Sequence, residues 1–229
     1  MSSIAIIIPV LNEAAGIRAQ LETLQAVRTE GVTLTVVDGG SDDNTRELAD
    51  PLVDRLVVCP RGRAVQMNKG AQLCAGDVLL FLHADTSLPP AACARIREAI
   101  EDGALWGRFD VCIDAAHPLL RIVERMMNWR SSLTGIATGD QAIFVRRDVF
   151  EQTGGYPALP LMEDIALSAK LKRVAHPARL RAQVVTSGRR WEKHGVLRTI
   201  FLMWCLRAEY FFGVDPIKLA ARYGYSGKG

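Results

Sequence analysis

The chain has 229 residues, of which 49% are hydrophobic and 23% are charged. This composition excludes disordered, collagen-like and coiled-coil chains, and the length suits one α/β domain or two small ones. The net charge of +3 is uneven, because residues 170–229 hold 13 of the 28 Lys and Arg residues but 3 of the 25 Asp and Glu residues. Such a basic segment is typical of a region that meets a phosphate, a membrane surface or a nucleic acid.

The N-terminal half alternates apolar runs with amphipathic stretches, as repeated βαβ units do. Strands are expected at 4–8, 34–37, 56–58 and 78–82. Helices are expected at 17–24, from Asp43, at 64–74, and after Pro89-Pro90, where proline suits a first turn. The fully apolar run at 78–82 indicates a parallel sheet covered on both faces.

The second half of the chain is less regular. Strands are expected at 106–113 and 141–145, and helices at 119–129, 164–174 and 196–211. No repeat or linker divides the chain, so the sequence predicts one α/β domain over residues 1–229. We expect a doubly wound, mostly parallel sheet in the N-terminal half and a mixed C-terminal half that closes over it.

The five cysteines, Cys59, Cys74, Cys93, Cys112 and Cys205, are an odd number without a C-x-x-C pair. They indicate neither a disulfide framework nor a thiolate zinc site. The start of the chain has neither the basic region nor the cleavage site of a secretory signal. The longest apolar run has seven residues, at 200–206, well short of the roughly 20 of a membrane span. We therefore expect a cytoplasmic protein, either free or peripheral on the inner face of the membrane.

Polar clusters follow three of the expected strands, at 9–13, 38–45 and 83–86. Because ligands of open parallel sheets bind beyond the carboxyl ends of the strands, these clusters form the candidate site. Taken singly, Asn12 and Asp43 suit helix N-caps. Asp38 and Asp85 fit a purely structural interpretation less well, because a lone carboxylate that closes a buried strand is costly unless it binds something.

Two common nucleotide motifs are absent. No G-x-G-x-x-G follows the first strand, and no G-x-x-x-x-G-K-[ST] occurs, so dinucleotide and P-loop sites lose their main support. A phosphate-bearing ligand needs another anchor. A divalent cation on Asp85 would supply it, because hard cations take carboxylate oxygens and share their shell with diphosphate and water.

Four motifs together resemble the family 2 glycosyltransferases with the GT-A fold. They are Pro9-Val10-Leu11-Asn12-Glu13, Val37-Asp38-Gly39-Gly40-Ser41-Asp42-Asp43-Asn44-Thr45, Gly76-Asp77 leading to Phe81-Leu82-His83-Ala84-Asp85, and Glu163-Asp164. The resemblance runs from residue 4 to about 191 and is strongest to small stand-alone bacterial members, some of them labelled as arsenosugar-pathway enzymes. It implies inverting transfer of a sugar from a nucleotide donor, UDP by default, to an acceptor hydroxyl.

The resemblance also divides the chain into a nucleotide-binding half at 1–100, an acceptor half at 101–192 and a basic amphipathic tail at 193–229. The nucleotide would be held by Pro9, Leu11, Glu13, Asp38, Arg63 and Asn68. Arg61 and Lys69 lie in the same stretch as Arg63 and equally suit a solvated surface. Gly39 stands where a second Asp is common in the family, which leaves the base open.

His83-Ala84-Asp85 takes the place of the family's D-x-D, so Asp85 is expected to bind the metal, Mn²⁺ or Mg²⁺, as a Lewis-acid cofactor. His83 is either a second metal ligand, which would favour Mn²⁺ because nitrogen is the softer donor, or a contact to ribose or phosphate. Asp164 is expected to be the general base. The alternative is that Glu163 and Asp164 merely favour a helix N-terminus.

Further along, two segments are expected to bind acceptor or diphosphate. Their candidate residues are Gly139, Asp140, Gln141, Arg190 and Trp191. The last two belong to a segment like the Q-x-x-R-W element of processive members, with Ser187 in place of the Gln.

The stretch from Val196 to Phe212 is apolar and aromatic with flanking cations, and suits a core helix, a membrane surface or a homodimer contact. A small-molecule or lipid-linked acceptor is expected. Nucleic acid is not expected, because the aromatic residues group together instead of interleaving with Lys and Arg. The alternative function is an inactive nucleotide-sugar-binding or membrane-associated scaffold on the same fold, against which the retention of Asp85 and Asp164 argues.

Overall fold

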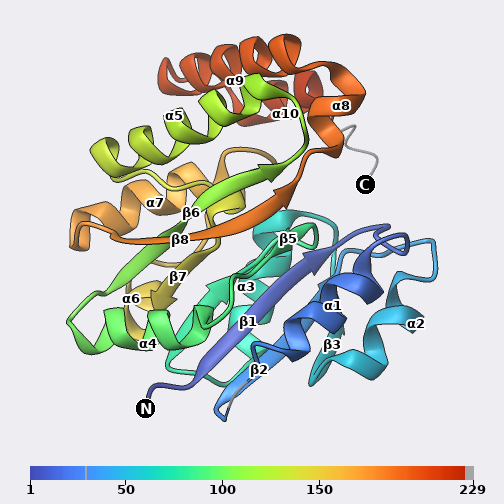
Figure 1. Ribbon diagram of the computed structural model, residues 1–229, viewed down its shortest axis with the longest axis vertical. Helices are drawn as coiled ribbons and strands as arrows, with labels where there is room; N and C mark the ends of the chain where they lie inside the picture. The colour runs from blue at the N-terminus through green and yellow to red at the C-terminus, as the bar shows by residue number, and fades with distance from the viewer. Residues whose placement is uncertain (29, 225–229) are drawn as a thin grey trace.

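A computed structural model describes residues 1–28 and 30–224, which build one eight-stranded sheet with the order β3-β2-β1-β4-β7-β6-β8-β5 (Figure 1). The first four strands are β1 (Ile4–Val10), β2 (Val32–Asp38), β3 (Arg55–Val58) and β4 (Val78–Phe81). They are all parallel, as the apolar runs predicted, and β1 lies between β2 and β4.

The remaining strands make the sheet mixed. They are β5 (Thr86–Ser87), β6 (Trp106–Asp114), β7 (Ile143–Arg146) and β8 (Ala178–Ser187). β7 is antiparallel to both β4 and β6, whereas β8 is parallel to β6 and antiparallel to the short β5. The expected combination of a parallel N-terminal half with a mixed C-terminal half is therefore confirmed.

Helices cover both faces of the sheet. Ile4, Ile6 and Ile8 of β1 point to the face covered by α1 (Ile17–Gln25) and α4 (Ala92–Glu101). Ala5 and Ile7 point to the other face, covered by α3 (Arg63–Leu73), α6 (Arg147–Gln152) and α7 (Glu163–Val174). The alternation follows from the two-residue period of a strand and buries every side chain of β1 except Pro9 almost completely. The small elements α2 (Thr45–Ala49) and η1 (Asp50–Leu52) connect β2 to β3.

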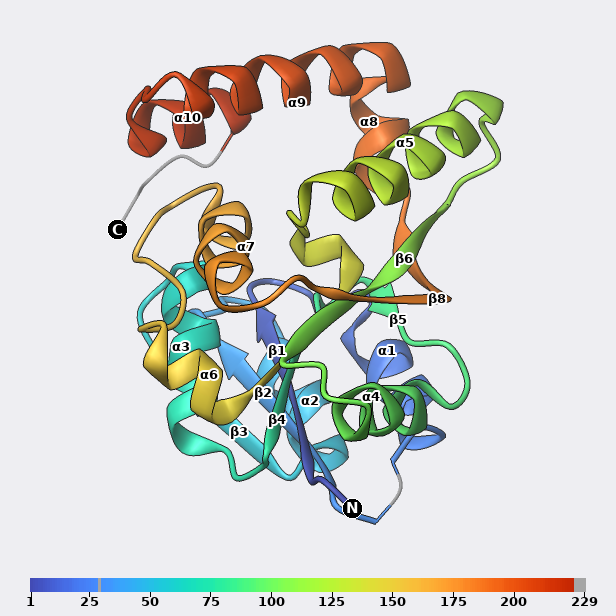
Figure 2. The same cartoon turned by 90° about the vertical axis from the view of Figure 1, so that its left-hand side faces the viewer.

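The remaining helices form a layer above the C-terminal half. α5 (Pro118–Thr134) packs on β6, and α8 (Arg189–His194), α9 (Val196–Phe211) and α10 (Pro216–Tyr223) follow β8. α9 runs along the top of the molecule over α5 and α7 (Figure 2). Its Leu206 packs in a small cluster with Leu161 and Met162, the residues just before α7.

α9 is not the core helix that its apolar composition also suited. Only Thr199 and Leu206 of its side chains are buried, and Phe201 and Trp204 are 72% and 60% exposed. Among the described residues, none of the helices combines the length and the apolarity that crossing a membrane requires. The membrane surface and the homodimer contact, the other two predictions for this helix, stay predictions.

Candidate active site

The candidate site lies where the sheet changes direction. From β1 the chain builds outward to β2 and β3 on one side and then returns to β4 on the other, so the carboxyl ends of β1 and β4 form a topological switch point. Open α/β sheets bind ligands at such points. The loops that follow β1, β2 and β4 carry the three polar clusters of the sequence.

The loops after β1 and β2 are joined by hydrogen bonds. Backbone N–H groups of Asn12, Glu13 and Ala14 donate to Ser41, Thr45 and Asp43, at 2.9, 2.8 and 3.1 Å. The side chain of Asn12 accepts from the backbone of Asp42, and its own backbone is left-handed, with φ of 54°. Since α1 begins only at Ile17, the interpretation of Asn12 as a helix cap is wrong: it braces one loop against the other.

Asp38 ends β2 with a fully buried carboxylate. One oxygen accepts hydrogen bonds from the backbone N–H groups of Gly40 and Ser41, each at 2.9 Å, and the other accepts from the Ser41 hydroxyl. These three hydrogen bonds compensate the free-energy cost of burying the charged carboxylate. Its role toward a nucleotide stays a prediction.

Gln66 is a buried link that sequence reasoning missed. Its amide nitrogen donates to the carbonyl oxygens of Val10 and Val37, both at 2.8 Å, and so ties the ends of β1 and β2 together. A Cβ atom at Gly39 would lie 3.0 Å from the Gln66 oxygen. The absence of a side chain at Gly39 is therefore what leaves room for Gln66.

Asp85, Glu13 and Arg189 meet beside a cleft of about 360 Å³ that all three residues line. The Arg189 guanidinium lies 3.3 Å from a Glu13 oxygen and 3.9 Å from an Asp85 oxygen. Burial raises the pKa of Glu13 above its ordinary value, although Arg189 opposes this shift. Two carboxylates thus face one exposed cation at the end of β4.

These donors fit a divalent cation that shares its shell with a ligand. Asp85 is 36% exposed, and its only side-chain partner among the described residues is the distant Arg189. No group of three or more His, Cys, Asp or Glu side chains suited to a metal occurs in the described part of the chain. A cation here would take one or two protein carboxylates and complete its shell with diphosphate and water oxygens, as Mg²⁺ commonly does.

His83 is paired with Asp140. Its Nδ1 lies 3.2 Å from an Asp140 oxygen. Burial raises the pKa of Asp140, but His83 together with the Arg63 and Arg207 charges outweighs burial, so this pKa falls below its ordinary value. The opposite side of the ring packs on Gly139, where a Cβ atom would approach His83 Nε2 to 2.2 Å. His83 therefore orients Asp140 in this structure, and its part in metal or ribose binding stays a prediction.

Asp164 lies in the first turn of α7 and reaches the same segment. One of its oxygens accepts a hydrogen bond from the Gly139 backbone at 2.8 Å, and the other accepts from Ile165 at 2.7 Å. The residue that precedes the helix, Met162, is left-handed, with φ of 68°. A carboxylate can accept about four hydrogen bonds, so Asp164 can accept a further hydrogen bond from a donor such as a hydroxyl group.

A salt bridge connects the start of α3 to this turn. Arg63 Nη1 lies 3.3 Å from an oxygen of Glu163, whose side chain is 3% exposed. Burial raises the pKa of Glu163, and the nearby Arg63 charge opposes that rise. Arg63 is thus placed beside the acids at the start of α7, which the sequence did not indicate.

Other predicted site residues have structural partners. Both ends of the Asn68 amide bind the backbone of Tyr156, at 2.8 and 3.0 Å. Gln141 is fully buried in the turn η2 (Gly139–Gln141), where a strand was expected to begin. Arg190 stacks 3.6 Å over the Tyr223 ring and donates to its carbonyl oxygen. Pro9, Leu11 and Trp191 are half-buried. Binding roles for all six stay predictions.

Two half-buried arginines near Asp164 were not expected. Arg130 of α5 and Arg207 of α9 each bear a side-chain nitrogen that is shielded from solvent and has no hydrogen-bond partner among the described residues. In the sequence both look like ordinary polar positions of amphipathic helices. Only the packing of α9 over α7 reveals them.

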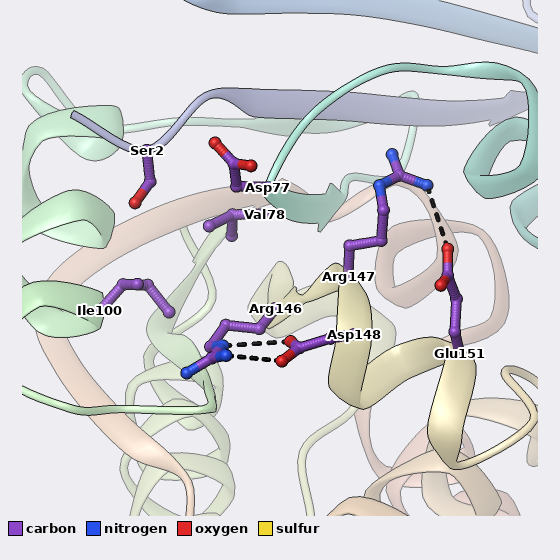
Figure 3. Close-up of a pocket in the computed structure, with 8 residues that line it drawn as sticks. All are labelled: Ser2, Asp77, Val78, Ile100, Arg146, Arg147, Asp148 and Glu151. Carbon is purple, nitrogen blue, oxygen red and sulfur yellow. Dashed lines mark hydrogen bonds and ion pairs between the residues drawn. The ribbon is translucent and has the colours of Figure 1, made fainter.

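A second cleft, of about 460 Å³, lies near the opposite ends of the parallel strands, and Figure 3 shows the side chains that line it. It is lined by residues next to the amino ends of β1 and β4, including Ser2 and Asp77. Its charged side chains pair with one another, Arg146 with Asp148 and Arg147 with Glu151. It therefore offers no converging reactive groups, and the geometry favours the switch point as the site.

The sequence model of the family described as Glycosyl transferase family 2 matches residues 5–154, more than half of the chain. The chain belongs to glycosyl transferase family 2. The membership confirms the resemblance seen in the four motifs and the GT-A fold that it implied. The arsenosugar label stays a prediction.

Curated members of family 2 match parts of the chain. The PGL/p-HBAD biosynthesis glycosyltransferase of Mycobacterium bovis is 40% identical over 91 residues, which cover 37% of this chain and 36% of that protein. The dolichol-phosphate mannosyltransferase of Pyrococcus furiosus is 26% identical over 165 residues, 68% of this chain and 46% of that protein. The chain thus spans less than half the length of these relatives.

Among solved structures, the mannosyltransferase PcManGT of Pyrobaculum calidifontis, determined with GDP-Man and Mn²⁺, superposes with a TM-score of 0.65 at 21% identity. The superposition covers 100% of this chain and 66% of that one. At this identity the likeness shows the fold alone, and it extends through the C-terminal helices that lie outside the family match.

Proposed function

We propose that the protein is an inverting, divalent-metal-dependent glycosyltransferase that moves a sugar from a nucleoside diphosphate donor, UDP by default, to an acceptor hydroxyl. The observation that carries this proposal is a chain of contacts at the switch point. His83, two residues before Asp85, pairs with Asp140, and the adjacent Gly139 donates to Asp164. A candidate metal-binding carboxylate and a candidate base thereby belong to one connected site.

The residues have separate tasks in this mechanism. The acceptor hydroxyl attacks the anomeric carbon, a new carbon–oxygen bond forms, and the bond to the diphosphate oxygen breaks. Asp164 takes the hydroxyl proton as general base. The Gly139 N–H group holds one oxygen of this carboxylate and so fixes its orientation.

Asp85, with Glu13 beside it, would hold Mn²⁺ or Mg²⁺. When bound, such a cation supplies Lewis-acid neutralisation of the charge on the leaving diphosphate. The Mn²⁺ in the PcManGT structure supports a divalent cation in this fold. Arg189 already balances the two carboxylates without a metal, and Arg63 adds positive charge on the other side of the site.

The donor site is tested first with a thermal-shift screen of UDP, GDP, CDP, dTDP and their sugars, each with and without Mn²⁺. A ligand that binds the folded state raises the melting temperature. We expect one nucleotide to raise it by several degrees and to require Mn²⁺ for the effect. A folded sample that shifts with none of these ligands would contradict a donor site and favour the scaffold alternative.

We further propose that the protein acts at a membrane surface on a lipid-linked acceptor. Exposed apolar side chains recur along α5 and along α9 with the residue after it, and together they are called the exposed apolar face: Ile122, Met126, Trp129, Leu133, Leu197, Phe201, Trp204, Phe211 and Phe212. These side chains are 45–84% exposed. Exposed Arg125 and Arg198 lie on the same helices, and aromatic side chains with neighbouring cations are typical of helices that lie in an anionic interface.

The apolar face is tested by vesicle co-sedimentation. The double variant Phe201→Gln, Trp204→Gln should bind phosphatidylglycerol vesicles at least about tenfold more weakly than the wild type, since fully burying one such side chain contributes about 1.5–3 kcal/mol. Val174→Gln, which changes an exposed valine at the end of α7, should bind as the wild type does. The face would instead be assigned to a homodimer if two results were obtained. The double variant would bind vesicles as the wild type does, and the wild type would form a concentration-dependent dimer that the double variant does not form.

A further inference from the structure

Arg130 and Arg207 approach the start of α7 from two different helices. α5 carries Arg130, and α9, which runs over both α5 and α7 in Figure 2, carries Arg207. Both guanidinium groups lie within electrostatic reach of Asp164, and Arg207 also lies within reach of Asp140. The packing of Leu206 against Leu161 and Met162 holds Arg207 over this turn.

Each of the two guanidinium groups has one nitrogen that the described residues leave without a hydrogen bond. Nη2 of Arg130 and Nε of Arg207 are shielded from solvent, and neither donates a hydrogen bond to any described residue. Buried donors without acceptors are rare in folded proteins, because they lose their bonds to water and gain nothing in return. Two such donors beside a candidate catalytic carboxylate indicate a missing acceptor.

The two arginines also repel each other. Burial and the neighbouring Arg207 lower the pKa of Arg130 to about 10, and burial lowers the pKa of Arg207. Both side chains still carry their positive charge at neutral pH. Asp164 lies within electrostatic reach of both arginines, and Asp140, which also pairs with His83, lies within reach of Arg207. A further anion between the two guanidinium groups would relieve their mutual repulsion.

The chemistry of the site favours phosphate as that anion. A guanidinium group presents planar donors that match phosphate oxygens, and buried arginines are well suited to this role. Arg190, the candidate that the sequence offered for diphosphate, is instead stacked on Tyr223. Trp129 and Trp204, near Arg130 and Arg207 on the same helices, belong to the exposed apolar face, so an apolar chain on that face would have its head group near the arginines.

We propose that Arg130 and Arg207 bind the phosphate group of a phosphate-bearing lipid acceptor and hold its hydroxyl near Asp164. The assignment rests on the proposed glycosyltransferase function and specifies its acceptor. The phosphate supplies the acceptor atoms that the two buried nitrogens lack, and its negative charge removes the repulsion between the arginines.

The test uses the full chain, with farnesyl phosphate, farnesol and inorganic phosphate as calorimetric probes. We expect farnesyl phosphate to bind at least tenfold more tightly than farnesol, and Arg130→Gln and Arg207→Gln each to remove this difference. Inorganic phosphate should compete with farnesyl phosphate but bind more weakly. Arg125→Gln and Arg198→Gln, which remove exposed charges from the same helices, should behave as the wild type.

Binding of UDP and GDP with Mn²⁺ is measured on the same samples. Unchanged nucleotide affinity in both arginine variants is expected, and an equal loss of nucleotide binding would assign the pair to the donor diphosphate instead. Equal affinity for farnesyl phosphate and farnesol would refute the phosphate site, and equal affinity for inorganic and farnesyl phosphate would refute the lipid. If the wild type binds no nucleotide, the proposed donor site is refuted. The comparison of farnesyl phosphate with farnesol still tests the phosphate site.

Stability supplies an independent measurement should a glutamine variant lose its fold. Arg130→Met and Arg207→Met each remove one of two repelling charges and one nitrogen without a hydrogen bond, so each variant should melt no lower than the wild type in phosphate-free buffer. Inorganic phosphate should raise the melting temperature of the wild type and not that of either variant. Lower melting of both methionine variants without any phosphate effect on the wild type would show a structural role and overturn the proposal.

Discussion

The Asp164→Asn variant should lose sugar transfer by about 10²- to 10⁴-fold, the usual contribution of a positioned general base. Asparagine has nearly the same shape, and its one side-chain oxygen can keep the hydrogen bond from the Gly139 backbone, whereas the bond that the second carboxylate oxygen accepts from Ile165 is lost. The amide cannot take the proton of the acceptor hydroxyl. The release of nucleoside diphosphate in the presence of donor, acceptor and Mn²⁺ measures the loss.

Two further measurements make this result specific. Nucleotide affinity should remain close to that of the wild type, because the base acts on the acceptor and not on the donor. Asp102→Asn removes an exposed acid just after α4 and should leave transfer unchanged. Full activity of Asp164→Asn would refute the assigned base.

The Asp85→Ala variant should lose metal-dependent nucleotide binding completely. Asp85 is 36% exposed, and its side chain has only a distant ion pair with Arg189, so its removal should cost little stability. Without it the cation loses its principal protein ligand, and the diphosphate loses the bridge to the protein. The thermal shift with the preferred nucleotide and Mn²⁺ should therefore disappear, with transfer lost in parallel.

Asp102→Ala is the matched control, and its shift should equal that of the wild type. A normal melting temperature without ligand shows that Asp85→Ala is folded. If UDP or GDP still raised that temperature with an unchanged Mn²⁺ dependence, Asp85 would not be the metal ligand.

Strong hydrophobic patterns in the sequence predicted most of the sheet. The positions of β1, β2 and β4 follow from their largely apolar side chains, which are buried on both faces of the parallel sheet, whereas β3, at the edge, is only partly buried. β8 was missed, although Leu180, Ala182 and Val184 alternate with polar residues across it. Its arginines, including Arg179 and Arg181, gave the segment a polar appearance that concealed the two-residue period of a half-covered strand.

The residues of the candidate site that follow strand ends could be predicted from the sequence. Glu13 and Asp85 follow β1 and β4 directly, so the topology brings them to one edge. The sequence could not show that Asn68 binds the backbone of Tyr156, or that Arg207 reaches Asp164, because these contacts join segments that no local pattern relates. Tertiary packing alone decides them.

The contact between Gly39 and Gln66 limits which residues can occur together at these two positions. The Gln66 amide nitrogen is held by two carbonyl oxygens, and a Cβ atom at residue 39 would lie 3.0 Å from the amide oxygen, so a side chain there would press on this link. An acid at residue 39 would fit better beside a smaller residue at position 66. The two positions should therefore covary in an alignment. An acid introduced at Gly39 alone should weaken the hydrogen bonds by which Gln66 joins the ends of β1 and β2.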